Sequence, residues 1–181
     1  MTIFCTFNMT PLTVLVTGGT LLLAVSDGGS ATDGTMQVPA ALNPDRLSLL
    51  QEVSARGVQI YSCAGTPAGA ASWALKGPDA QLFDSQNKLV GRHYAGPTWE
   101  DLQGGKVVGA ARINIPASVD NAIPWLLLDV KSREGSGAFT RARAIVRMQT
   151  TGGTAPPDGC DGARAGQEER VPYTAIYVFL K

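Results

Sequence analysis

The chain has 181 residues, enough for one domain and a processed end. Its composition, with 44% hydrophobic and 17% charged residues, is typical of a folded protein rather than a disordered one. Fifteen basic and fifteen acidic side chains balance, so the charge does not indicate nucleic acid as a partner. His93 is the single histidine, which excludes two-histidine zinc sites, HExxH helices and His₂-carboxylate iron sites; we expect no bound metal.

The beginning of the chain resembles a secretory leader. No Lys or Arg precedes Arg46, residues 11–25 form an uncharged and mostly apolar run, and residues 26–34 are small or polar. The run is shorter than the about 20 residues that cross a bilayer, and it fits the hydrophobic region of a signal peptide, although a basic n-region is missing. We therefore expect a leader over residues 1–31, a domain over residues 32–181 and a secreted or periplasmic location. No membrane span is expected after leader removal.

Residues 13–20 also look like a first strand that enters the glycine turn of a dinucleotide-binding fold. That fingerprint requires a third glycine, which is absent, and an acidic residue about 20 positions later. The acidic candidate, Asp45, stands beside Pro44, and no alternating strands and helices follow. We expect no cofactor.

Loss of the leader would remove Cys5 and leave Cys63 and Cys160. An even pair without CxxC spacing is typical of one disulfide in an oxidising compartment, and it argues against redox catalysis or a zinc ribbon. By chain-entropy arguments such a long loop would be worth about 4–5 kcal/mol. Two separate buried thiols are the alternative.

Residues 43–53 fit two structures. Asn43 as N-cap, Pro44 at the first helical position and apolar residues at a spacing of three favour a helix. Leu47, Leu49 and the following Gly57 suit an early strand, which we favour.

Short β-forming runs separated by Gly and Pro dominate the rest of the chain. Strands are predicted over residues 58–63, 107–113, 123–130, 139–150 and 175–180, and a hairpin over residues 80–94 with its turn at 85–87. The nearly continuous apolar run 123–130 indicates a central strand. Residues 151–171 predict a long surface loop held by Cys160. The fold class is therefore all-β, a mainly antiparallel β-sandwich or barrel with long Gly/Pro-rich loops.

Several segments together resemble the DUF3455 family. They are residues 57–63 (GVQIYSC), 73–80 (WALKGPDA), 93–99 (HYAGPTW), 123–128 (IPWLLL), 150–156 (TTGGTAP) and Cys160-Asp161. The similarity runs in order from about Val38 to the C-terminus. The family is a domain of unknown function in bacterial and fungal proteins that often carry secretion signals. The resemblance implies export and a compact domain, and it transfers no catalytic residue.

His93 lies in the densest cluster of unusual residues, residues 93–99. On a hairpin arm His93 and Tyr94 would face opposite sides of the sheet. Beside Trp99, Glu100 or Asp101, His93 could act as a base or bind a polar ligand. The alternative is that it hydrogen-bonds a turn carbonyl and fixes the corner at residues 96–97.

Trp73, Trp99 and Trp125 could form a stacking platform for a sugar or an aromatic ligand. Core packing is the favoured alternative for the set, above all for Trp125 within its apolar run. Trp99 follows a Gly-Pro turn and is the best candidate for exposure.

Other catalytic patterns are weak. The two adjacent acids at 100–101, like those at 168–169, would point to opposite faces of a strand, so neither pair places two carboxylates across one cleft as a glycosidase requires. Gly135-Ser136-Gly137 lacks the GxSxG spacing of a nucleophile elbow. Arg141, Arg143 and Arg147 share one parity and predict a basic stripe on one strand face, which would suit an anionic ligand or plain solvent exposure equally.

The favoured interpretation is an exported β domain that binds a small molecule or a saccharide. The expected binding residues are His93, Tyr94 and Trp99, with Trp73 and Lys76 as neighbours. The alternatives are an enzyme of unknown reaction that uses His93 with a carboxylate, and a structural or stress-related envelope protein without a ligand site. Burial of these side chains distinguishes the three hypotheses.

Overall fold

The computed structural model describes residues 37–65 and 71–181. The expected leader over residues 1–31, its cleavage region and the alternative strand–glycine turn at 13–20 lie outside the described residues. Among the residues described, no helix is long and apolar enough to cross a membrane.

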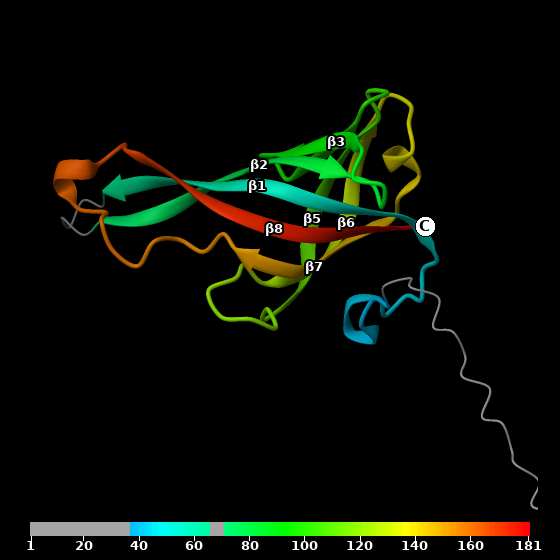
Figure 1. The fold of residues 1–181 in the computed structure, drawn as a ribbon, viewed down its shortest axis with the longest axis horizontal. Helices are drawn as coiled ribbons and strands as arrows, with labels where there is room; N and C mark the ends of the chain where they lie inside the picture. The colour runs from blue at the N-terminus through cyan, green and yellow to red at the C-terminus, as the bar shows by residue number, and fades with distance from the viewer. Residues whose placement is uncertain (1–36, 66–70) are drawn as a thin grey trace, which may run out of the picture. The chain divides into compact units, whose positions relative to one another are not determined.

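The described chain forms an antiparallel β-barrel of eight strands joined in chain order (Figure 1). The strands are β1 (Leu49–Gly65), β2 (Ala71–Phe83), β3 (Leu89–Tyr94), β4 (Thr98–Asp101), β5 (Lys106–Ile115), β6 (Trp125–Glu134), β7 (Ala144–Gly152) and β8 (Glu168–Leu180). β8 pairs with β1 and closes the ring. Three short 3₁₀ helices accompany them: η1 (Ala40–Leu42), η2 (Phe139–Arg141) and η3 (Gly162–Arg164). The all-β prediction is confirmed, in its barrel form.

Two local predictions are confirmed, because the residues that form a turn lie next to the strands that it joins. The predicted hairpin is β2–β3, whose turn is held by the Asp84 carboxylate, which accepts hydrogen bonds from the backbone N–H groups of Gln86 and Lys88. For residues 43–53 the preferred strand is confirmed from Leu49 onward, and the helical alternative is wrong. Asn43 instead closes a turn by exchanging two hydrogen bonds with the Leu47 backbone.

The predicted strand over residues 139–150 is wrong in its first part. Phe139 begins η2, stacks on Phe179 with ring centroids 4.2 Å apart, and donates its backbone N–H to Asp101. β7 therefore begins only at Ala144. The predicted loop 151–171 is also too long, because β8 already begins at Glu168, where its extended backbone pairs with β1 at Ser62.

Two apolar clusters lie on the two faces of the barrel wall. The first lies in the interior and takes side chains from most strands, among them Val53, Leu82, Val107, Ile145 and Phe179. The second covers the outer face of β6, β7 and β8, where Leu42 is fully buried together with the side chains of Leu127, Val146, Met148 and Val178. Because both faces of β6 are covered, the run 123–130 is apolar apart from Asp129 rather than alternating.

The end of β1 and the beginnings of β2 and β8 run together beyond the other strands in Figure 1. The expected Cys63–Cys160 disulfide is present here and joins β1 to the loop before η3, with the two Cα atoms 5.3 Å apart. The Trp73 indole N–H donates to the Asp158 carbonyl at 2.9 Å and adds a second link between β2 and the same loop.

Candidate ligand-binding cavity

A cavity of about 340 Å³ lies in the barrel interior, near the lower end of the about 300–1,000 Å³ typical of ligand sites. Its buried floor is made of Gln59 from β1, His93 from β3, Trp99 from β4, Leu128 from β6 and Tyr177 from β8. Its exposed rim is made of Leu75, Lys76, Gly96 and Ala111. The cavity therefore opens to solvent between β2, β5 and the turn that joins β3 to β4.

His93 and Trp99 face each other at the floor because β3 and β4 form a tight hairpin. The two residues are register partners and both side chains point inward. Their rings stack with centroids 4.2 Å apart and planes 13° apart, and both pack edge-on against Tyr177. Gly109 in β5 makes room for the indole, since a Cβ there would lie 3.1 Å from Trp99 Cζ3.

His93 is a neutral hydrogen-bonding group rather than a cation. Its Nδ1 lies 2.8 Å from the Thr98 carbonyl oxygen, which only accepts, so Nδ1 carries the proton and Nε2 is left as an acceptor. Burial lowers the pKa of His93 to about 3; the bond to Thr98 opposes this shift and the positive charge of Arg147 adds to it. The turn-fixing hydrogen bond weighed as the alternative role of His93 is thus present, in a side chain that also lines the cavity.

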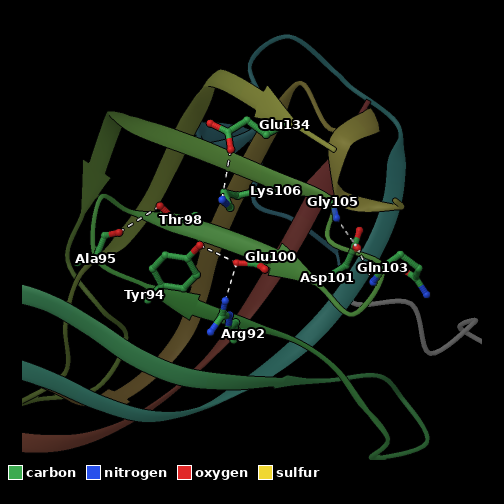
Figure 2. Close-up of polar contacts among 10 residues, drawn as sticks. All are labelled: Arg92, Tyr94, Ala95, Thr98, Glu100, Asp101, Gln103, Gly105, Lys106 and Glu134. Atoms are coloured by element: carbon green, nitrogen blue, oxygen red, sulfur yellow. Dashed lines mark hydrogen bonds and ion pairs between the residues drawn. The ribbon is translucent and has the colours of Figure 1, made fainter. Parts of the chain in front are cut away.

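The carboxylates expected beside His93 lie elsewhere. Glu100 is on the outer face of β4, where Tyr94 donates its hydroxyl at 2.7 Å and Arg92 forms an ion pair at 3.0 Å (Figure 2). Asp101 points inward, but its oxygens accept backbone N–H groups of residues 103, 105 and 139. Within residues 37–65 and 71–181, no hydrogen bond joins His93 to a carboxylate. The geometry required by the enzyme hypothesis is not assembled in the described chain.

Arg147 lines the cavity, a placement that the sequence did not predict. It shares the inward parity of Ile145 in β7, and its Nε and Nη2 donate to the Pro124 carbonyl at 3.0 and 2.8 Å. The predicted basic stripe is wrong, because Arg141 belongs to η2 and Arg143 precedes β7. The parity shared with Ile145 is the signal that could have identified Arg147 as an interior residue.

Two buried polar atoms of the lining have no hydrogen-bond partner in the described protein. They are the side-chain oxygen Oε1 of Gln59 and the indole nitrogen Nε1 of Trp99. Trp125 Nε1 is also unpartnered, but it lies outside this cavity, where Trp125 packs on the outer cluster as expected for a core residue. An unpartnered buried polar group costs about 1–3 kcal/mol.

The cavity brings together three of the five residues expected to bind a ligand, His93, Trp99 and Lys76. Their binding role stays a prediction. Tyr94 does not join them, because its strand parity turns it outward toward Glu100. Trp73 does not join them either, because it lies on the extended end of β2 against Asp158. The sequence did not indicate the other polar lining residues, Gln59, Arg147 and Tyr177.

Comparison with family models gives one match that covers most of the chain. The model of DUF3455, described as a protein of unknown function, matches residues 44–181. Comparisons with curated proteins and with solved structures gave no significant match. The matched range contains every residue that lines the cavity.

Proposed function

Because this chain belongs to the DUF3455 family, which brings no known activity, we propose from its geometry that it is a binding domain holding a small molecule in the barrel cavity. The observation that carries this proposal is the cavity itself, whose buried floor includes Gln59 and Trp99, two residues that each have a side-chain polar atom without a protein partner. Buried polar groups in folded proteins are satisfied in the great majority of cases, and a ligand is the partner that a cavity can admit.

The lining favours a compact, partly apolar ligand over a saccharide. Trp99 is only 1% exposed and His93 covers one face of its ring, so the predicted exposure of Trp99 is wrong and the indole offers no open platform of the kind that sugars stack on. Leu75, Leu126 and Leu128 supply apolar surface around the space. A sugar ring would place several hydroxyl groups against these side chains without partners.

We also propose that binding takes place outside the cytoplasm. The Cys63–Cys160 disulfide supports this location, since such bonds persist mainly in oxidising compartments. A non-reducing mass map of protein recovered from the producing cells tests it directly. A linked peptide pair is expected, and two free thiols would contradict the proposal.

The experiment for binding uses a single fluorophore in the cavity. In a Trp73→Phe/Trp125→Phe background only Trp99 remains as a tryptophan, at the cavity floor. The protein is titrated with a panel of small organic compounds and saccharides. The small organic compounds should give saturable changes in the Trp99 emission, and the saccharides should not.

A matched pair of variants shows whether the signal comes from the cavity. Ala111 lines the rim, whereas Ala110 is its neighbour on β5 and is not part of the lining. Ala111→Phe should narrow the opening and weaken binding about tenfold or more, while Ala110→Phe leaves it unchanged. If no compound changes the emission of the folded protein, or if both variants behave alike, cavity binding is wrong and the structural hypothesis replaces it.

A further inference from the structure

Resting on the proposed function, we propose that the ligand is an organic anion whose acidic group lies against Arg147 and whose apolar body lies against the leucine side of the cavity. Arg147, Leu126 and Leu128 line the same space, so one small molecule can contact all three. Such a ligand belongs to the carboxylate or sulfonate class, attached to an aliphatic or aromatic skeleton.

The cavity lining is positively charged. Arg147 and Lys76 are the basic residues among those that line the cavity, and none of the lining residues is acidic. Lys76 is at the exposed rim and pairs with Glu168, so its charge is already balanced. Within residues 37–65 and 71–181 no carboxylate forms an ion pair with Arg147. The cavity therefore holds one unbalanced positive charge.

The hydrogen bonds of Arg147 orient this charge without neutralising it. Its Nε and Nη2 both donate to one neutral group, the Pro124 carbonyl. A guanidinium has five N–H donors, so donors remain for a ligand. Arg147 is half-buried, and an anion in the cavity would balance its charge while forming charge-assisted hydrogen bonds.

The apolar residues of the lining favour an apolar body on the ligand. Leu75 at the rim is 57% exposed, which places an apolar side chain in water at the entrance. Leu126, Leu128 and Pro97 continue this apolar surface inward. Inorganic anions lack the body that this surface would cover.

The test compares two fluorescent probes that share one ring system and one amine. 8-Anilinonaphthalene-1-sulfonate carries a negative charge, and N-phenyl-1-naphthylamine is its neutral counterpart. We expect both to bind the native full chain, with the sulfonate about tenfold tighter or more, as charge-assisted hydrogen bonds allow. 1-Naphthoate should displace the neutral probe about tenfold better than 1-naphthalenemethanol for the same reason.

Variants assign the preference to Arg147. Arg147→Met should abolish the preference for the sulfonate and keep binding of the neutral probe. Arg143→Met removes an exposed charge just before the same strand and should change neither affinity. Arg147→Lys keeps the charge and should keep part of the preference, so it replaces the methionine variant if loss of the Pro124 contacts prevents folding.

The outcomes separate the anion assignment from cavity binding itself. Equal affinities for charged and neutral probes in the wild type would overturn the assignment and leave the binding function standing. A preference for the sulfonate that persists in folded Arg147→Met would likewise overturn it. Failure of every probe to bind folded protein would overturn the proposed function and the anion assignment together.

Discussion

His93 stabilises the fold as a neutral ring. Its pKa falls from an ordinary 6.5 to about 3 because the side chain is buried and Arg147 is close, while the bond to Thr98 acts in the opposite direction. Between these two pH values the unfolded chain binds more protons at this residue than the folded chain does. The stability linked to His93 is therefore complete above about pH 6.5 and is lost as the pH falls toward 3.

Replacing His93 with Phe should remove this pH dependence while keeping an aromatic ring against Trp99. From about pH 6 to pH 4, the wild type should lose roughly 1.4 kcal/mol of unfolding free energy per pH unit relative to the variant. Urea unfolding at several pH values measures both slopes, and the comparison cancels the titration of the carboxylates. Parallel slopes would show that His93 is protonated in the folded protein and contradict the neutral ring.

At the scale of the elements, inward-facing glycines set how closely strands approach. A Cβ on Gly57 in β1 would lie 2.2 Å from the Asp79 carbonyl oxygen and 2.4 Å from Ala80 Cα, both in the backbone of β2. Glycines in strands mark tight bends and close backbone contacts in small barrels. Gly57 therefore permits the β1–β2 pairing that carries Gln59 and Lys76 toward the cavity.

Gly57→Ala should destabilise the barrel by about 1–3 kcal/mol or more, because backbone on both sides would have to move. Gly65→Ala, at the end of the same strand, is the control: its added Cβ would meet its nearest neighbour at 4.0 Å, which is an ordinary contact. Thermal denaturation followed by circular dichroism should show a lower Tm for the first variant and a change of a few tenths of a kcal/mol or less for the second. Similar melting temperatures would refute the close-contact argument.

At the scale of the whole molecule, one covalent bond ties chain segments that are distant in sequence. Cys63 and Cys160 are separated by 97 positions, and their bond anchors the loop before η3 to the outer end of β1. Restricting so long a loop stabilises the fold chiefly by limiting the unfolded chain. Backbone hydrogen bonds between Cys63 and residues 166 and 167 hold the same loop, so the anchoring region does not depend on the disulfide alone.

Cys63→Ala/Cys160→Ala should therefore fold but lose roughly 4–5 kcal/mol of unfolding free energy, the entropic contribution of a loop near 100 residues. Denaturant unfolding of the variant and of the wild type, with and without a reductant, measures this loss. The reduced wild type should match the variant. An unchanged unfolding midpoint in both would mean that the loop is already constrained in the unfolded chain.

The amino-acid sequence by itself determined the local features of this protein. Alternation of apolar residues, the Asp84 turn and the even cysteine pair predicted strands, a hairpin and a disulfide, because each depends on neighbouring residues or on simple counting. The resemblance to DUF3455, confirmed over residues 44–181, assigned the chain to a family but gave no activity.

Only the tertiary structure decided which faces are buried and which side chains meet. Ring closure through the β1–β8 pairing makes one face of every strand an interior, and the segment around Leu42 then covers the outer face of β6 to β8. Arg147 thereby becomes a cavity residue instead of part of an exposed stripe. Parity predicted that His93 and Tyr94 face opposite sides, and ring closure decided that His93 is the one that faces inward. Strand parity in the sequence says which residues share a face; long-range pairing decides whether that face meets water, core or cavity.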